Sequence, residues 1–325
     1  MKSLLFFCLF LLTTFVSINL FGNETLSSTG INRENSKVVL ITGASRGIGW
    51  ETAKKLASQG HHVYASMRSL KSCALNQENL PDFLQVLELD VTDDLSIAKA
   101  FETLNQKEGR LDVLINNAGC AVFGPLEVVT IEQAKRTFEV NFFGTMRLMQ
   151  TALPIMREQG KGLIINLSST SGIRPSPGWD IYAASKFAIE GLSESVAAVA
   201  RQWNIDVVIV EPGTTSTDFM KQSTEMGSRC TSKTRIYDNF MPNAFKWMQE
   251  RLADGQNPAE VAEVISTIVS SEHHHLRYQT SLKGKQTVAN RHCDPTGEKS
   301  IQEQELLIKQ LWRGPLDAHM GSSYR

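Results

Sequence analysis

The sequence predicts an α/β fold, a Rossmann-type doubly wound parallel sheet in a single domain. Short apolar runs rich in β-branched residues alternate with helical patterns from residue 37 to residue 210. Such alternation is typical of a parallel sheet that helices cover on both faces. A glycine-rich turn also follows the first apolar run, at the position where folds of this type bind phosphate groups.

The first strand is expected over residues 37–41 (KVVLI), which are apolar after the lysine, as in a strand buried on both faces. The helix after the glycine-rich turn should end at Gly60, because glycine readily adopts the left-handed conformation that closes a helix. Further strands are expected at residues 63–66, 84–89, 111–115, 162–167 and 206–210. Further helices are expected from Asp93 or Asp94 to about residue 106, over 131–158 and over 182–201.

Residues 214–257 are irregular in pattern and rich in Met, Phe and Trp, and we expect them to form the substrate loop. Methionine and aromatic side chains suit an adaptable apolar pocket, although ordinary core packing is an equal alternative. Beyond this loop the sequence shows one clear helix, over residues 258–270, opened by Asn257 and Pro258.

Composition excludes several classes of protein. The 325 residues hold 33 Lys and Arg against 34 Asp and Glu, so the basic excess of a general nucleic-acid binder is missing. The 42% hydrophobic and 21% charged fractions are those of a globular chain. The cysteines are odd in number and form no CxxC pair, which favours reduced thiols: Cys8, Cys73, Cys120, Cys230 and Cys293. No metal site is expected, since the adjacent His273, His274 and His275 point in different directions.

The N-terminus predicts a separate segment. Lys2 precedes an apolar run over residues 4–21, which falls between the about 20 residues of a spanning helix and the roughly 7–15 of a signal core. Because no good cleavage site follows, residues 1–22 are expected to be an uncleaved membrane anchor; a cleaved signal and a stray apolar start are the alternatives. Residues 23–36 should be a polar linker and residues 37–325 the folded domain. The protein would then be membrane-associated, and otherwise exported or cytoplasmic.

The turn after the first strand has the pattern of a phosphate-binding loop. Gly43 permits a tight turn, Gly47 lets the backbone approach a pyrophosphate, and Gly49 lets the following helix pack closely. The helix N-terminus offers free N–H groups and the positive end of its dipole to the phosphate. Ser45, Arg46 and Ile48 complete the set of residues expected to contact a dinucleotide in this loop.

The second strand bears on the choice between NAD and NADP. A ribose hydroxyl calls for a carboxylate near its end, whereas the 2′-phosphate of NADP calls for arginine. The segment holds Arg68 and no acid, and Arg46 is a second cation, so NADP(H) is expected. After the third strand, Asp90 and Val91 are expected to flank the adenine, unless Asp90 serves only as a helix cap.

A catalytic set is expected in the second half. Tyr182 and Lys186 are four residues apart on one helix, so they share a face. A free tyrosine has a pKa of about 10, and a nearby ammonium would lower it toward the operating range. Ser169 ends a strand and can hydrogen-bond a substrate oxygen. Asn141 is an awkward residue inside a helix, which suggests a polar role.

Together these residues resemble the short-chain dehydrogenase/reductase family in its single-domain branch, over about residues 37–220. The resemblance rests on T-G-x-x-x-G-x-G at 42–49, N-N-A-G at 116–119, Asn141, Ser169, Tyr182, Lys186, Pro212-Gly213 and Thr217. It implies that Tyr182 is the general acid/base, Ser169 orients the substrate, and Lys186 holds the nicotinamide ribose and lowers the tyrosine pKa. Asn141 would hold a water of a proton relay. Pro212, Gly213 and Thr217 would lie along the nicotinamide, and Asn117, Ala118 and Gly119 along the adenosine.

Residues 64–70, 211–213, 276–280 and 294–297 look more particularly like the estradiol 17β-dehydrogenase and retinol dehydrogenase subgroup. This finer resemblance implies NADP(H) and a small apolar alcohol or ketone: a steroid, a retinoid or a long-chain carbonyl. The family resemblance also implies a homodimer or homotetramer. A sugar-nucleotide epimerase or dehydratase and a non-catalytic NADPH-binding sensor are the alternatives. The first usually has a larger C-terminal domain, and the second would need no Ser169, Tyr182 or Lys186.

Overall fold

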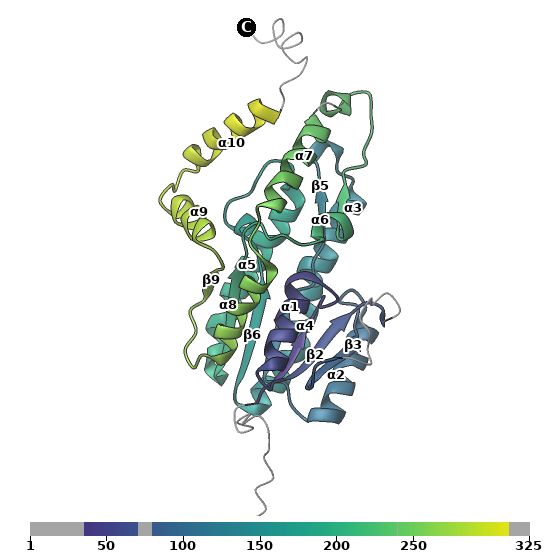
Figure 1. Ribbon diagram of the computed structural model, residues 1–325, viewed down its shortest axis with the longest axis vertical. Coiled ribbons are helices and arrows are strands. Elements are labelled where there is room, and N and C mark those ends of the chain that lie inside the picture. The colour runs from purple at the N-terminus through teal and green to yellow at the C-terminus, as the bar shows by residue number, and fades with distance from the viewer. Residues whose placement is uncertain (1–35, 71–79, 239, 312–325) are drawn as a thin grey trace, which may run out of the picture. The chain divides into compact units, whose positions relative to one another are not determined.

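Seven parallel strands form the central sheet in the computed structural model, which describes residues 36–70, 80–238 and 240–311 (Figure 1). In chain order the strands are β1 (Val38–Ile41), β2 (His62–Met67), β3 (Leu84–Glu88), β4 (Val113–Asn116), β6 (Gly162–Leu167), β7 (Ile205–Glu211) and β9 (Arg277–Gln279). Their order across the sheet is β3-β2-β1-β4-β6-β7-β9, and every neighbouring pair is parallel. The predicted doubly wound Rossmann-type sheet is confirmed.

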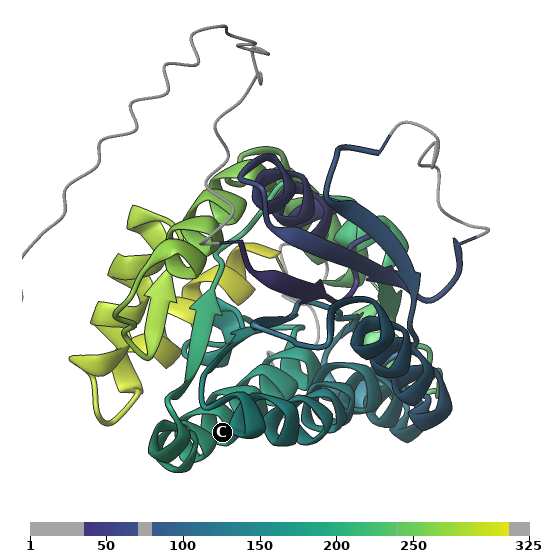
Figure 2. The ribbon, with the colours of Figure 1, turned by 90° about the horizontal axis from the view of Figure 1, so that it is seen from below.

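Helices cover both faces of the sheet (Figure 2). One face carries α1 (Gly47–Ser58) and α8 (Pro258–Ser270), and the other carries α2 (Asp94–Glu108), α4 (Gly144–Gln159) and α5 (Asp180–Ala200). Strand β1 shows why its sequence is apolar throughout: Val39 and Ile41 pack into the cluster under α1 and α8, whereas Val38 and Leu40 pack into the opposite cluster. Side chains alternate between the two faces of a strand, so a strand buried on both needs an unbroken apolar run.

The clear helix expected over residues 258–270 is confirmed as α8. The Asn257 side chain accepts a hydrogen bond from the Ala259 N–H at 2.9 Å, and Pro258 occupies the first turn. The structure adds β9 and two helices, α9 (Leu282–His292) and α10 (Glu298–Leu311). Helix α10 has one buried residue, Leu311, and packs on the rest of the protein through the partly buried Leu307 and Ile308.

The long helix expected over residues 131–158 is interrupted. It consists of α3 (Ile131–Phe138), a π-helical turn (Glu139–Phe143) and α4. Single π-helical turns inside α-helices are frequent at functional sites. Asn141 lies in this turn, and the wider turn directs its side chain into the protein interior, where it is fully buried.

The segment 214–257 is more regular than its sequence predicts. It contains the short helix α6 (Phe219–Gln222), strand β8 (Thr224–Met226) and helix α7 (Phe240–Ala253). Strand β8 pairs in parallel with β5 (Ala121–Phe123), which follows the N-N-A-G motif. This small second sheet attaches the substrate loop to the chain just beyond β4.

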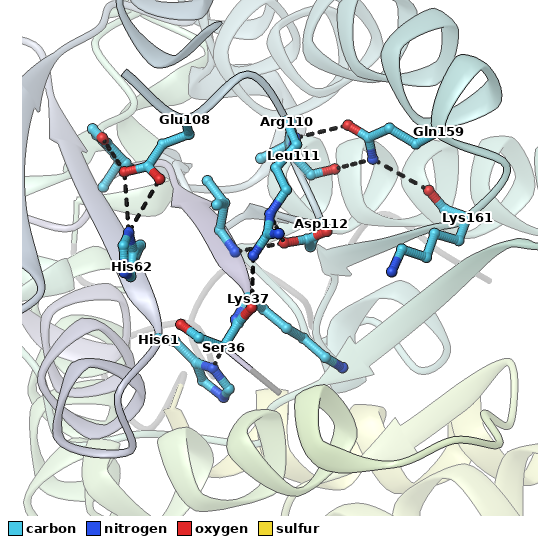
Figure 3. A network of polar contacts seen from close by, with 12 residues as sticks. Ser36, Lys37, His61, His62, Glu108, Arg110, Leu111, Asp112, Gln159 and Lys161 are labelled. Atoms are coloured by element: carbon cyan, nitrogen blue, oxygen red, sulfur yellow. Dashed lines mark hydrogen bonds and ion pairs between the residues drawn. The ribbon is translucent and has the colours of Figure 1, made fainter. Parts of the chain in front are cut away.

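A polar network closes the amino ends of the strands (Figure 3). The Asp112 carboxylate accepts a hydrogen bond from the Val38 N–H at 2.7 Å and pairs with Arg110 at 3.0 Å. Arg110 also donates to the Ser36 carbonyl at 2.8 Å, and the Gln159 amide bonds both backbone groups of Leu111 at 2.9 Å. These groups are satisfied among themselves, which leaves the carboxyl ends of the strands as the edge that offers polar groups to a ligand.

The predicted anchor over residues 1–22, nearly all of the linker over 23–36, and Cys8 and Cys73 lie outside the described residues. Within the described residues no helix is both long and apolar enough to cross a membrane.

Candidate active site

One cavity of about 880 Å³ opens along the carboxyl ends of the strands. Parallel sheets bind ligands at this edge, because their loops converge there. The expected site residues that line it are Gly43, Ser45, Arg46, Gly47, Ile48, Arg68, Asp90, Val91, Asn117, Gly119, Ser169, Tyr182, Lys186, Pro212, Gly213 and Thr217. Gly49, Ala118 and Asn141 do not line the cavity but lie behind its wall.

The glycine loop is packed too closely against its neighbours to hold larger side chains. Gly43 and Gly47 have φ values of +64° and +57°, which glycine adopts at little cost. A Cβ on Gly43 would lie 2.7 Å from the Ala118 Cα, and one on Gly49 would lie 2.5 Å from the Asn117 Nδ2. Ala118 and Gly49 therefore support the loop by close packing. Helix α1 starts here without a side-chain cap or an acidic residue in its first turn, so its N–H groups remain for an anion.

Asn117 stabilises the loop. Its side-chain Nδ2 donates to the Thr42 carbonyl at 2.8 Å and to the Gly43 carbonyl at 3.0 Å. The Thr42 hydroxyl in turn accepts the N–H groups of Asn117 and Ala118, each at 3.0 Å. The N-N-A-G motif thus holds the glycine loop in shape from the neighbouring strand, a role that its sequence does not reveal.

Two arginines lie at the entrance to this part of the cavity. Arg46 immediately precedes α1 and Arg68 immediately follows β2, and neither pairs with a carboxylate within the described part of the chain. Asp90 accepts hydrogen bonds from its own turn, from the Thr92 N–H at 2.9 Å and the Thr92 hydroxyl at 2.7 Å. Its neighbour Val91 is buried against Gly144, where a Cβ would approach to 2.7 Å.

Ser169, Tyr182 and Lys186 come together on the floor of the cavity. Tyr182 is in the first turn of α5 and Lys186 one turn later, with the Lys186 Nζ 5.6 Å from the centre of the tyrosine ring. The Lys186 ammonium donates to the Leu167 carbonyl at 2.7 Å, at the end of β6. Ser169 is two residues further, and its hydroxyl is hydrogen-bonded to that of Tyr182. The geometry places two hydroxyl groups next to each other beside a buried cation.

Burial governs the ionisation of this set. It raises the pKa of Tyr182 to about 12, against the opposing effect of the Ser169 hydrogen bond, and lowers the pKa of Lys186 to about 8. The tyrosine shift is opposite in direction to the one expected from the lysine alone, because removing a phenolate from water is unfavourable. At neutral pH Tyr182 is consequently a proton donor beside a charged Lys186.

Asn141 is held by three side-chain hydrogen bonds. Its Oδ1 accepts the Cys120 N–H at 2.8 Å, and its Nδ2 donates to the Cys120 carbonyl and to the Ser185 hydroxyl, each at 2.9 Å. Ser185 precedes Lys186 on α5, so Asn141 links the N-N-A-G turn to the helix that carries Tyr182 and Lys186. The partner Ser185 was not predicted, because its spacing resembles that of any buried small residue.

A buried charged network lies behind Lys186, and the sequence analysis missed it. Glu190, one turn after Lys186, and Glu211 at the end of β7 are 5% and 0% exposed. Arg277 of β9 places its Nε 3.0 Å from Glu190 and 3.5 Å from Glu211, and the Gln279 amide donates to Glu211 at 2.8 Å. Burial raises the pKa of Glu190 to about 7. A glutamate on the buried face of an apolar helix was the available signal in the sequence.

The substrate side of the cavity is apolar. The Tyr182 ring lies 5.5 Å from the ring centre of Trp179 and 5.9 Å from that of Phe219. Trp247 and Met248 of α7 belong to the same cluster and line the same cavity, and Leu311 of α10 completes the cluster from outside. The expectation that the aromatic and Met-rich loop borders the site agrees with these positions.

The remaining residues singled out in the sequence lie apart from the cavity, except Cys120. The His274 ring contacts Asp206 at 2.9 Å and the Ile268 carbonyl at 3.0 Å, as a structural side chain. No group of three His, Cys, Asp or Glu suitable for a metal occurs in the described ranges. Cys120, Cys230 and Cys293 are free thiols, and burial raises the pKa of Cys120 to about 11.

Comparison with known proteins defines the class. The family described as short chain dehydrogenase matches residues 37–227. A 3-ketodihydrosphingosine reductase of Bacteroides thetaiotaomicron is 36% identical over 72% of this chain and 84% of its own length. Retinol dehydrogenase 8 of Bos taurus is 34% identical over 88% of this chain and 93% of its own. The 17-beta-hydroxysteroid dehydrogenase type 1 of Homo sapiens is 36% identical over 81% of this chain and 83% of its own length.

Solved structures agree. A short-chain dehydrogenase from Streptomyces avermitilis superposes with a TM-score of 0.72 at 30% identity, over 85% of this chain and 98% of that one. The structure of ElxO with NADP bound superposes with a TM-score of 0.61 at 25% identity, over 75% of this chain and 98% of that one.

The chain therefore belongs to the short-chain dehydrogenase/reductase family. It is an NAD(P)-dependent oxidoreductase that acts on a small molecule, and within the family it is similar to the hydroxysteroid and retinol dehydrogenases.

Proposed function

We propose that this protein is an NADP(H)-dependent oxidoreductase that interconverts an apolar ketone and its alcohol, with Tyr182 as the general acid/base. The observation that carries the proposal is that Ser169, Tyr182 and Lys186 line the same cavity as the glycine loop. Each feature alone is common in proteins, whereas a proton donor, a buried cation and a phosphate cradle in one cavity suit reduction of a carbonyl group.

The residues present fit a dinucleotide. Gly43 and Gly47, which line the cavity, and the uncapped start of α1 suit its pyrophosphate. Arg46 and Arg68, which have no carboxylate partner among the described residues, would hold a 2′-phosphate, and this favours NADP(H) over NAD(H). Lys186 would hold the nicotinamide ribose, Pro212, Gly213 and Thr217 the nicotinamide, and Asp90 and Val91 the adenine. When bound, the cofactor supplies or accepts the hydride.

The side chains then handle the proton. In reduction, the Ser169 hydroxyl orients the substrate oxygen, and the Tyr182 hydroxyl donates its proton to that oxygen. The phenolate that remains is stabilised by the Lys186 ammonium. Asn141 holds the Cys120 backbone and Ser185 in place around this set. Because burial raises the pKa of Tyr182 to about 12, its hydroxyl keeps its proton at neutral pH and can serve as the acid in reduction.

The substrate class follows from the walls of the cavity. Aromatic rings of Trp179 and Phe219 flank Tyr182, and Trp247 and Met248 continue the apolar surface. Relatives named for retinol, a hydroxysteroid and 3-ketodihydrosphingosine support an apolar alcohol or ketone. The apolar run over residues 4–21 supports attachment to a membrane, which extraction of the full-length chain with alkaline carbonate would test.

Cofactor binding tests the proposal first. Purified full-length protein would be titrated with NADPH and with NADH, following reduced-nicotinamide fluorescence, and then used to screen apolar ketones. We expect NADPH to bind roughly ten-fold or more tightly than NADH, and Arg68→Asp to abolish the difference. Arg110→Gln, at the opposite end of the sheet, is the matched control and should preserve it. Equal binding of both cofactors by the unaltered protein would contradict the assignment of NADP(H).

A further inference from the structure

The apolar wall of the substrate side ends in a pair of arginines. Arg251 is one turn after Trp247 on α7, and its guanidinium carbon lies 4.7 Å from the centre of the indole ring. Arg174, which follows the short helical turn after Ser169, lines the same cavity. Both come from the substrate side, whereas Arg46 and Arg68 come from the glycine loop and β2. The pair therefore lies outside the set that the dinucleotide would use.

The two arginines differ in how their charges are compensated. Arg174 pairs with Glu303 of α10 at 2.6 Å. Arg251 is partly buried and has no carboxylate partner within residues 36–70, 80–238 and 240–311. Asp218 and Asp254 line the cavity too, but neither forms an ion pair with Arg251. Burial lowers the pKa of Arg251, and the positive charge of Arg174 adds to this effect.

A partly buried guanidinium without a counter-ion is unfavourable, and a second cation nearby increases that cost. Stacking on Trp247 fixes the plane of the guanidinium, so its N–H groups are oriented before a ligand arrives. A planar carboxylate is the group that such a fork binds best, because two parallel hydrogen bonds then form.

Accordingly, we propose that Arg251, with Arg174 beside it, binds a carboxylate of the substrate. The substrate class would be apolar oxo or hydroxy acids whose carboxylate is remote from the carbon that reacts at Tyr182. This inference rests on the proposed function and narrows its substrate. It assigns the apolar wall of Trp179, Phe219 and Trp247 to the body of the substrate and the arginine pair to its charged end.

Binding of unreactive ligands tests the arginine pair without requiring turnover. Dodecanoate and dodecanol have the same chain length and differ in charge, and each would be titrated calorimetrically into the full-length protein saturated with NADP⁺. We expect dodecanoate to bind about ten-fold or more tightly than dodecanol, because its carboxylate would form charge-assisted hydrogen bonds that the neutral hydroxyl of dodecanol cannot form. Arg251→Gln should remove that preference and leave dodecanol binding unchanged, and Arg251→Lys should retain part of it.

Arg229→Gln is the matched control, because Arg229 lies on the same substrate loop but lines a different cavity. It should leave the preference for dodecanoate intact. Equal affinity for the two ligands in the unaltered protein, or an undiminished preference in Arg251→Gln, would overturn the inference.

Reduction of the neutral 6-dodecanone by NADPH distinguishes this inference from the proposed function. Reduction of this ketone without any preference for dodecanoate contradicts only the arginine site. A preference that depends on Arg251, in a protein that reduces neither 6-dodecanone nor a long-chain oxo acid, contradicts only the proposed reaction.

Discussion

The cofactor side and the substrate side of the cavity are built by different means. On the cofactor side, hydrogen bonds hold the residues that position the site: Asn117 binds the glycine loop, Asn141 binds the Cys120 backbone, and Lys186 binds the end of β6. On the substrate side, the side chains of Trp179, Phe219 and Trp247 lie in an apolar cluster and make ring and cation–π contacts. Hydrogen bonds require particular distances and angles, whereas apolar contacts tolerate displacement.

This difference indicates how the two sides can change. Reaction chemistry needs its groups within a narrow geometry, so the cofactor side should respond sharply to small substitutions. The substrate side should respond gradually, because apolar surface contributes in proportion to its area. Substitutions on the two sides of the cavity test that contrast.

Removal of the Tyr182 hydroxyl should have the largest effect. Tyr182→Phe keeps the ring contacts with Trp179 and Phe219 but removes the proton donor, so kcat/KM should fall by about 10²–10⁴. Steady-state kinetics with NADPH and an apolar ketone measure this, with Tyr278→Phe in β9 as the control. An unchanged rate, or an unchanged biological effect of the variant, would favour the non-catalytic sensor.

The substitution Asn141→Ala should have the next largest effect, which is on stability. It leaves the backbone groups of Cys120 and the Ser185 hydroxyl without their partner in a buried place. We expect Tm to fall by roughly 5–10 °C, since each unsatisfied buried group costs about 1–3 kcal/mol. Thermal unfolding followed by circular dichroism would show this, and the exposed Asn105→Ala on α2 should change Tm by less than a degree or so. Equal shifts for the two variants would contradict the structural role.

On the substrate side, Trp247→Leu should act on binding alone. Loss of part of an apolar wall should raise KM for a neutral apolar ketone about 5- to 30-fold and leave kcat nearly unchanged. Trp203→Leu is the control, because Trp203 follows α5 on the surface and stacks with Arg157. A fall in kcat comparable to that of Tyr182→Phe would show that the substrate side is as strictly constrained as the cofactor side.

The smallest effect concerns the glutamates behind Lys186. The pKa of Glu190 is raised to about 7, so the folded protein holds this proton more tightly than the unfolded chain does. The stability that protonated Glu190 contributes is present below its ordinary pKa of 4.5 and is lost as the pH rises through about 7. The glutamine of the Glu190→Gln variant does not titrate. The Tm of the variant minus the Tm of the unaltered protein should therefore increase by a few degrees from about pH 5 to about pH 8.

Glu194→Gln is a close control for that experiment, since Glu194 pairs with the same Arg277 but has an exposed side chain. The difference in Tm between the Glu194→Gln variant and the unaltered protein should stay constant across the same pH range. A level difference for Glu190→Gln as well would contradict the raised pKa.

Local patterns in the sequence were sufficient to find most of the residues that line the cavity at the carboxyl ends of the strands. The glycine loop, the N-N-A-G motif and the Tyr182–Lys186 pair depend on short spacings that adjacent elements convert directly into geometry. Helix α8 was predicted over its observed range because its cap, its proline and its apolar stripe all lie within one segment.

Features that depend on distant contacts were not predictable in this way. The π-helical turn arises because Asn141 reaches Cys120 and Ser185, which no helical periodicity reveals. Helix α10 is polar along most of its length, and its place depends on Leu311 meeting α7. Arg277 joins Glu190 across 87 residues of chain, so neither residue indicates the other in the sequence.

The link from Arg277 to Glu190 and Glu211 also bears on the order of events during synthesis. A chain leaves the ribosome from its N-terminus, so α5 and β7 emerge before the residue that neutralises their buried carboxylates. Until β9 is translated and docks, packing the helix that carries Tyr182 and Lys186 requires burying two glutamates without their counter-charge. The nascent chain therefore completes the packing of this helix only when the last sixth of the chain has begun to appear.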